Sequence, residues 1–238
     1  MRQVALNNHI SGTFNIELEN LRNSVLTMGG EVEQQLLDTL KALKLNHPGL
    51  AEKVVLNDLK INSMEIQIDE ECIRIIAKRH PTASDLRLIM TISKAITDIE
   101  RMGDEIERIA KLVTRNKLPS SDTIKSSMLL IGERVAAMMR GTFDAFARQD
   151  ESAALAVYKQ DNRIDSEYKR LLTYTTTEME KTTEDMQDWL DVLWAMRSLE
   201  RIGDRCKNVC EYVVYLTRGT DVRHTPLENI HQKLEDLT

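Results

Sequence analysis

A duplicated motif constrains this chain more than any other feature. The segment IERMGDEIERI at residues 99–109 returns as LERIGDRCKNV at residues 199–209, a hundred positions later. Both copies keep Glu, Arg, an apolar residue, Gly and Asp in the same order, although the surrounding sequence differs. Self-similarity at a fixed spacing indicates a structural unit that is built twice. We therefore expect two related halves.

Composition indicates that both halves are helical. The 238 residues are 42% hydrophobic but only 4% aromatic, with 9 Gly and 4 Pro, which is typical of long helices rather than sheets. A chain of this length can bury a sizeable core as one elongated domain or as two small ones. We predict an all-α protein.

The charge pattern and the cysteines narrow the choice of partners and compartment. The formal charge is −6 and the two signs are interleaved, so nucleic acid is not an expected partner. Three cysteines cannot all pair, and MRQVALNNHI lacks the apolar core of a signal peptide, so we expect a cytoplasmic protein. No apolar run approaches the roughly 20 residues that span a bilayer. Contact with a membrane is therefore expected only through partners.

Helix-breaking segments divide the chain into six parts. The breakers lie at residues 46–50, 79–85, 116–122, 148–152 and 179–185, and each intervening segment is long enough for one long helix. We predict two tandem three-helix bundles, at residues 1–117 and 118–220, followed by a polar tail at 221–238.

Several helix ends carry recognisable signals. Pro48 suits the first turn of the second helix, where its missing N–H costs nothing. Thr82 with Asp85 and Thr182 with Asp185 have the spacing of capping boxes that open the third and sixth helices.

Two helices carry a matching apolar seam. In the third helix, apolar or small residues recur in steps of four and three at Ile92, Ile96, Ile99, Gly103, Ile106, Ala110 and Val113. The sixth helix repeats this pattern at Val192, Met196, Leu199, Gly203, Cys206, Cys210 and Val213. Glycine inside a helix costs up to about 1 kcal/mol relative to alanine, so we expect a neighbouring backbone to come close at both glycines. We interpret Cys206 and Cys210 as small core residues rather than a thiolate pair.

Acidic pairs lie beside each seam. Glu100 and Asp104 are four residues apart, as are Glu200 and Asp204, so each pair projects from one helix face. For an isolated pair, the simplest interpretation is a solvated flank whose repulsion is relieved by neighbouring arginines.

The second helix carries a further polar pair, Asp58 and Asn62. In an antiparallel hairpin, residues at equal distances from the turn face each other. A turn centred on Pro81 therefore places Asp58 beside Asp104 and Asn62 beside Glu100. We call these four residues the first cluster.

The fifth helix carries the corresponding pair, Asp161 and Asp165. A turn centred between residues 182 and 183 places Asp161 beside Asp204 and Asp165 beside Glu200. We call these four residues the second cluster.

Converging carboxylates repel one another, and a polyvalent cation relieves that repulsion. An oxygen-only set of ligands favours Mg²⁺, Mn²⁺, Ca²⁺ or iron over a closed zinc site of Cys and His.

These motifs resemble those of the PhoU family of bacterial phosphate-signalling regulators over roughly residues 10–218. The resemblance rests on RHPTASDLR, DIERMGDEIERIAK and its echo SLERIGDRCKNV, and the paired DLKIN and DNRID. It implies tandem three-helix bundles with multinuclear clusters of iron, manganese, magnesium or zinc. Carried onto this sequence, the ligands are Asp58, Asn62, Glu100, Asp104, Asp161, Asp165, Glu200 and Asp204. Asn62 stands where the second repeat has Asp165, so the first cluster has one negative ligand fewer and is expected to bind metal less tightly.

The resemblance also implies a function. The family represses the phosphate-starvation response by linking a phosphate-specific ABC transporter to a sensor histidine kinase, and a homodimer is the expected assembly. A metal-dependent phosphoesterase is a competing hypothesis, since carboxylate-bridged metals also hydrolyse phosphoesters. However, His80 lies about 20 residues from the acidic motifs, roughly 30 Å along a helix, so we expect no enzyme. A helical scaffold whose carboxylates bind nothing is the third alternative.

Overall fold

The computed structural model describes residues 12–115, 121–181, 186–223, 225 and 229. The described residues form seven α-helices and no strand. The helices are α1 (Gly12–Leu45), α2 (Pro48–Arg79), α3 (Ala83–Thr114), α4 (Asp122–Arg148), α5 (Glu151–Tyr158), α6 (Asp161–Met179) and α7 (Met186–Arg218). The predicted all-α class is confirmed.

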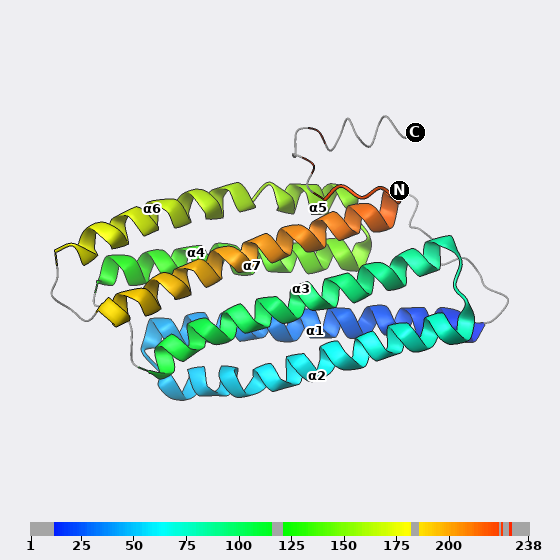
Figure 1. Ribbon diagram of the computed structural model, residues 1–238, viewed down its shortest axis with the longest axis horizontal. Coiled ribbons are helices and arrows are strands. Elements are labelled where there is room, and N and C mark those ends of the chain that lie inside the picture. The colour runs from blue at the N-terminus through cyan, green and yellow to red at the C-terminus, as the bar shows by residue number, and fades with distance from the viewer. Residues whose placement is uncertain (1–11, 116–120, 182–185, 224, 226–228, 230–238) are drawn as a thin grey trace.

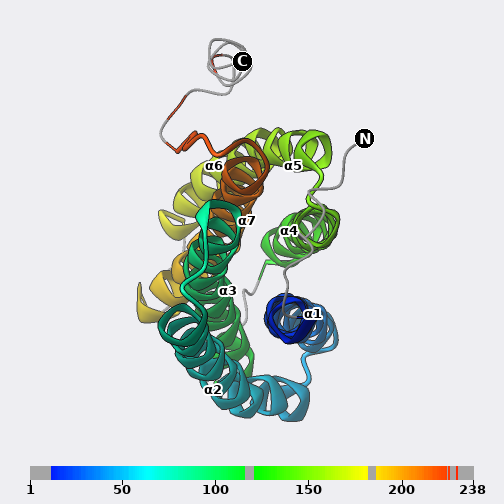
Figure 2. The same cartoon turned by 90° about the vertical axis from the view of Figure 1, so that its right-hand side faces the viewer.

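The helices form two bundles that lie side by side (Figure 1). Helices α1 to α3 make the first bundle, and α4 to α7 make the second. In the end-on view, α2, α3, α7 and α6 form a curved outer layer, with α1 and α4 on its inner side (Figure 2). The central helices α3 and α7 run antiparallel and pack against each other. One continuous apolar core extends through both bundles.

The fifth predicted helix is divided into α5 and α6. Lys159 and Gln160, which separate them, keep right-handed backbone angles. The Gln160 N–H donates to the Val157 carbonyl at 2.9 Å, the three-residue spacing of a 3₁₀ turn. This tightened turn makes Asp161 the first residue of α6.

The predicted helix ends are partly confirmed. Pro48 is the first residue of α2, and His47 before it accepts a hydrogen bond from the Leu50 N–H through Nδ1 at 3.0 Å. Thr82 is the N-cap of α3, but its side chain makes no capping bond. The capping box is therefore wrong there, and the Thr82 carbonyl accepts the Asp85 N–H instead. The second box, Thr182 with Asp185, lies outside the described residues.

Both predicted seams are buried along their whole length. Cys206 and Cys210 are fully buried, and burial raises the pKa of the Cys210 thiol to about 12. A protonated, inaccessible thiol is a core residue, as predicted from the spacing.

Candidate metal centres

Two hydrogen bonds set the register of α2 against α3. Ser93 Oγ donates to Asp69 Oδ1 at 2.9 Å, and Thr97 Oγ1 donates to Glu65 Oε1 at 3.1 Å. Each pair lies at equal sequence distances on either side of Pro81. The hairpin therefore has the register on which the predicted first cluster depends.

The first cluster brings Asp58, Glu100 and Asp104 close enough to affect one another. Burial raises the pKa of Asp58 to about 6, and the charges of Glu107 and Asp104 add to that rise. Burial also raises the pKa of Glu100 to about 7, with contributions from Asp104 and Asp58. Such mutual repulsion is the expected property of carboxylates that share one site.

Asn62 contacts Asp58 on its own helix rather than Glu100. Its Nδ2 donates to Asp58 Oδ2 at 3.3 Å, and the described residues show no hydrogen bond between Asn62 and Glu100. Asn62 Oδ1 is buried and accepts no hydrogen bond there. The Asn62 amide therefore binds Asp58 Oδ2 through its nitrogen, and its own oxygen, Oδ1, is available to bind a cation.

The second cluster has the same arrangement between α6 and α7. Burial raises the pKa of Asp161, and the charges of Asp165 and Asp204 add to the rise. Burial likewise raises the pKa of Glu200, with contributions from Asp204 and Asp165. The four residues that the mirror argument paired thus lie close enough for their charges to affect one another.

The glycine before each motif Asp makes room for a carboxylate of the facing helix. A Cβ added to Gly103 would lie 3.1 Å from Asp58 Oδ1, and one added to Gly203 would lie 3.0 Å from Asp161 Oδ1. The close neighbour is thus a side chain, and the expected approach of a second backbone is wrong. Gly103 and Gly203 allow Asp58 and Asp161 to lie across the seam.

Within the part of the chain that the structure describes, the same two oxygens have no hydrogen-bond partner. Asp58 Oδ1 and Asp161 Oδ1 are both buried without one, as is Glu200 Oε2. A buried carboxylate oxygen without a partner is costly. Its presence at the same place in both repeats makes Asp58 Oδ1 and Asp161 Oδ1 candidate ligands for a cation.

The neighbours of the two clusters carry opposite charges. Lys207, four residues after Gly203, donates from Nζ to Asp161 Oδ2 at 2.7 Å and lies 3.4 Å from Asp204 Oδ1. Burial is the largest single influence and lowers the pKa of Lys207, but the hydrogen bonds and charges of Asp161 and Asp204 together outweigh it and raise the lysine pKa. Glu107 occupies the equivalent position after Gly103 and pairs with Lys111 at 2.6 Å.

Sequence reasoning missed this exchange. The first repeat has Glu107 followed one turn later by Lys111, and the second repeat has Lys207 followed one turn later by Glu211. The order of the two charges is therefore reversed between the repeats. Aligning the repeats on their glycines would have revealed the reversal, because the two acidic motifs themselves match.

The donor set fits a hard cation, although the ligands are not fully gathered. Within the described ranges, no three His, Cys, Asp or Glu side chains are grouped closely enough to hold a metal ion. The first cluster has unpartnered oxygens on Asp58 and Asn62, and the second has them on Asp161 and Glu200. In each cluster these oxygens could bind a cation after the side chains rotate. In the second cluster, a cation would also have to displace Lys207 from Asp161.

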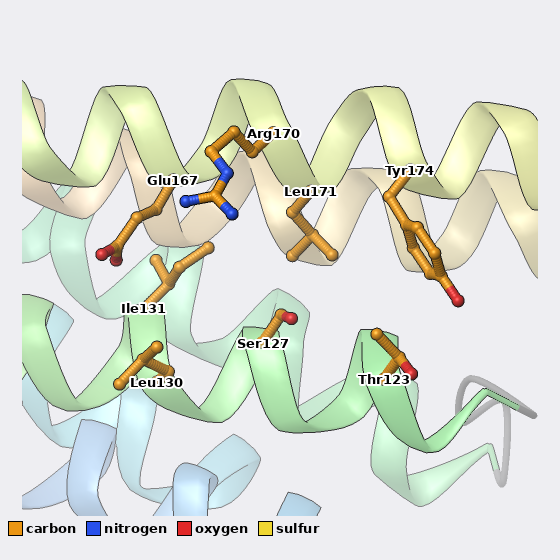
Figure 3. A pocket seen from close by; sticks show the side chains of 8 residues that line it. All are labelled: Thr123, Ser127, Leu130, Ile131, Glu167, Arg170, Leu171 and Tyr174. Atoms are coloured by element: carbon orange, nitrogen blue, oxygen red, sulfur yellow. The ribbon is translucent and has the colours of Figure 1, made fainter.

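A separate hollow lies between α4 and α6 (Figure 3). It is lined by Thr123, Ser127, Leu130, Ile131, Glu167, Arg170, Leu171 and Tyr174, and no member of either cluster is among them. Glu167 is paired with Arg134 at 2.9 Å. This hollow is therefore separate from the two carboxylate clusters and does not form a substrate pocket over them.

None of the described helices is long and apolar enough to cross a membrane.

The PhoU domain profile matches the chain twice, at residues 25–113 and 128–213. The phosphate-specific transport system accessory protein PhoU of Escherichia coli is 43% identical over 224 residues, which cover 94% of this chain and 93% of the relative. The Serratia marcescens protein of the same name is 44% identical, with coverages of 94% and 92%.

Solved structures agree with the sequence comparisons. The crystal structure of PhoU from Pseudomonas aeruginosa is 44% identical, with a TM-score of 0.83, over 87% of this chain and all of that chain. The phosphate transport system regulatory protein PhoU from Streptococcus pneumoniae is 30% identical, with a TM-score of 0.81, over 88% of this chain and 99% of that one. The chain belongs to the PhoU family and contains the PhoU domain twice.

Proposed function

We propose that this protein is a metal-binding, non-catalytic regulator of phosphate uptake and signalling in the cytoplasm. It represses the phosphate-starvation response by linking the phosphate ABC transporter to a sensor histidine kinase. The relatives support the transport part, because they are named accessory or regulatory proteins of phosphate transport.

One observation carries the metal-binding part. In both repeats a buried Asp oxygen lies against a seam glycine and has no hydrogen-bond partner. A solvated acidic flank would keep its oxygens in water, and a purely structural cluster would pair them. Metal bound at Asp58 and Asp161 would satisfy these oxygens and relieve the repulsion within each cluster.

A homodimer is the second part of the proposal. Helix α2 exposes an apolar stripe at Leu56, Leu59, Ile66 and Ile73, whose exposed fractions run from 59% to 70%. The equivalent positions of the second repeat are polar: Lys159, Asn162, Lys169 and Thr176. An exposed apolar stripe confined to one repeat suits a symmetric contact between two copies.

Sedimentation velocity tests the dimer. Leu59→Glu with Ile66→Glu should leave a monomer, whereas Asn162→Glu with Lys169→Glu at the matching positions of the second repeat should leave the dimer intact. If the wild type sediments as a monomer, the dimer proposal is wrong.

A genetic experiment tests the regulatory function. Deleting the gene should leave phosphate-starvation genes expressed at high phosphate, and the intact gene should restore repression. If the deletion strain keeps these genes silent, the regulatory proposal is wrong.

A second strain separates the role of metal from that of the fold. It carries the isosteric changes Glu100→Gln, Asp104→Asn, Glu200→Gln and Asp204→Asn, which remove charge and keep shape. We expect it to lose both bound metal and repression. Continued repression by a metal-free variant would show that the clusters are dispensable for signalling.

A further inference from the structure

A row of basic residues runs along the outer surface where the two bundles meet. Lys94, Arg101, Arg108 and Arg115 follow one another at seven-residue intervals. The first three lie on α3 and Arg115 is the C-cap of that helix, and all but the half-buried Lys94 are exposed. Two contacts show that this row faces α7. Lys94 Nζ lies 5.5 Å from the centre of the Tyr215 ring, and Arg108 shares Glu105 with Arg201 of α7.

Two acidic residues at this boundary, Asp98 and Glu105, are buried beneath the row. Asp98 accepts a hydrogen bond from Tyr212 at 2.8 Å and pairs with Arg205 at 3.1 Å. Glu105 accepts from Ser198 at 2.7 Å and pairs with both Arg108 and Arg201. Two arginines thus share one buried carboxylate, which leaves an excess of positive charge at the surface.

The two other arginines of the row, Arg101 and Arg115, are not neutralised by ion pairs within the described part of the chain. Neither Arg101 nor Arg115 forms one with any described residue, and both are exposed. In a chain whose formal charge is −6, exposed arginines without ion pairs on one face favour an acidic partner.

The row ends in a hollow that contains an exposed tryptophan. The hollow is lined by Arg108, Lys111, Arg115 and Trp194, by the half-buried Asp191, and by the buried Leu112 and Ala195. Its three basic residues outnumber its one acidic residue. Trp194 is 63% exposed. Tryptophan and arginine are the residues most enriched among those that dominate binding energy at protein interfaces, so the hollow is suited to an apolar side chain of a partner.

The spacing of the row identifies the kind of partner. Successive arginines are separated by about 10 Å, because seven residues rise by 1.5 Å each, which is too far for several of them to hold one small anion. A second helix laid along the row would present a side chain at the same interval. We propose that this surface is the docking site for an acidic α-helix of a partner protein. Its carboxylates pair with Arg101, Arg108 and Arg115, and an apolar side chain enters the hollow beside Trp194.

This inference deepens the proposed function, because it names the surface through which the regulator contacts a partner. The first test uses a synthetic lactam-bridged helix with Glu at every seventh position and a terminal Leu. Binding is measured by fluorescence anisotropy in EDTA, so that metal does not contribute. We expect binding that weakens as salt is added, whereas the same helix with Lys in place of Glu should not bind.

Charge reversal of the row provides the decisive variant. Arg101→Glu with Arg115→Glu should weaken binding of the acidic helix by about tenfold or more. The control is Lys41→Glu with Lys53→Glu, which makes the same change in net charge at exposed residues of α1 and α2. This control should bind as the wild type does. Equal binding by the Arg101/Arg115 variant and the wild type would overturn the inference.

Capture by purified phosphate transporter components separates the inference from the proposed function. Capture of wild type and control, but not of the Arg101/Arg115 variant, supports both. Equal capture of all three overturns the docking site and leaves the proposed function standing. If the transporter captures none of them, the transporter link is wrong, and the peptide titration alone decides the docking site.

Discussion

The two carboxylate clusters share a frame but differ in the charge beside it. Both place a buried Asp oxygen against a seam glycine, and in both that oxygen has no partner. The first cluster has Glu107 next to it, where the second has Lys207 bonded to Asp161. The difference teaches that the two repeats kept the same carboxylate frame while the charges around it diverged.

This difference in neighbouring charge changes which cluster is expected to bind metal more tightly. Asn62 in place of Asp165 gives the first cluster one carboxylate fewer, but Glu107 restores a negative charge and Lys207 removes one from the second cluster. Because Lys207 already occupies Asp161, metal entering the second cluster must displace an ammonium group. We therefore expect the first cluster to bind metal more tightly.

The largest expected effect comes from removing Lys207. Lys207→Gln leaves the buried Asp161 unpaired in the metal-free protein, and we expect a loss of about 2–4 kcal/mol in the free energy of unfolding. The control is Lys111→Gln in the first repeat, whose partner Glu107 is more accessible, and it should cost about 1 kcal/mol or less. Urea denaturation in EDTA measures both. Equal losses would mean that Lys207 is an ordinary surface lysine.

The seam glycines should come next. Gly103→Leu and Gly203→Leu force a side chain into the space held by Asp58 and Asp161, and overpacking of this kind costs about 1–3 kcal/mol. Gly30→Leu is the control, because a Cβ at Gly30 meets nothing within 4 Å. An unchanged melting temperature in both seam variants would show that the carboxylates move aside freely.

The pH dependence of stability tests the repulsion within the first cluster. The pKa of Asp58 is raised to about 6 and that of Glu100 to about 7, so the folded state holds protons that the unfolded state releases. Their contribution is fully present below about pH 4 and is lost as pH rises to about 7. The metal-free protein should lose on the order of 2 kcal/mol over that range, and Glu100→Gln should flatten the decline. Stability that rises with pH through this range in the wild type would contradict the account.

The smallest expected effect concerns metal affinity and the exchanged charges. Glu107→Lys should weaken Mn²⁺ binding at the first cluster by roughly tenfold, and Lys207→Glu should strengthen it at the second by a similar factor. Isothermal titration of each variant measures both changes. Glu19→Lys, at an exposed position of α1, should leave both affinities unchanged, and matching shifts in this control would mean that only net charge matters.

The fold and the register of α2 against α3 were predictable because they depend on periodicity and on symmetry about a turn. Apolar spacing identified the buried seams, and the Pro81 turn fixed the register of α2 against α3. The apolar seam and the acidic motif are repeated in each half of the sequence, so the halves supported one another.

Other features depend on local competition that no periodic pattern records. The break before Asp161 contains neither Pro nor Gly, and Thr82 caps its helix through its carbonyl rather than its hydroxyl. The contact from Lys207 to Asp161 requires a long side chain on α7 to reach the neighbouring helix α6. Such reach follows from packing, so only the structure reveals it.

Metal analysis of protein purified without chelator tests the central claim most directly. Inductively coupled plasma mass spectrometry should find a polyvalent metal in the wild type. The pair Glu100→Gln and Asp104→Asn should remove the tighter-bound fraction, the pair Glu200→Gln and Asp204→Asn should remove the weaker fraction, and all four changes together should remove both. A wild type without bound metal, or a fourfold variant with full metal content, would contradict the account.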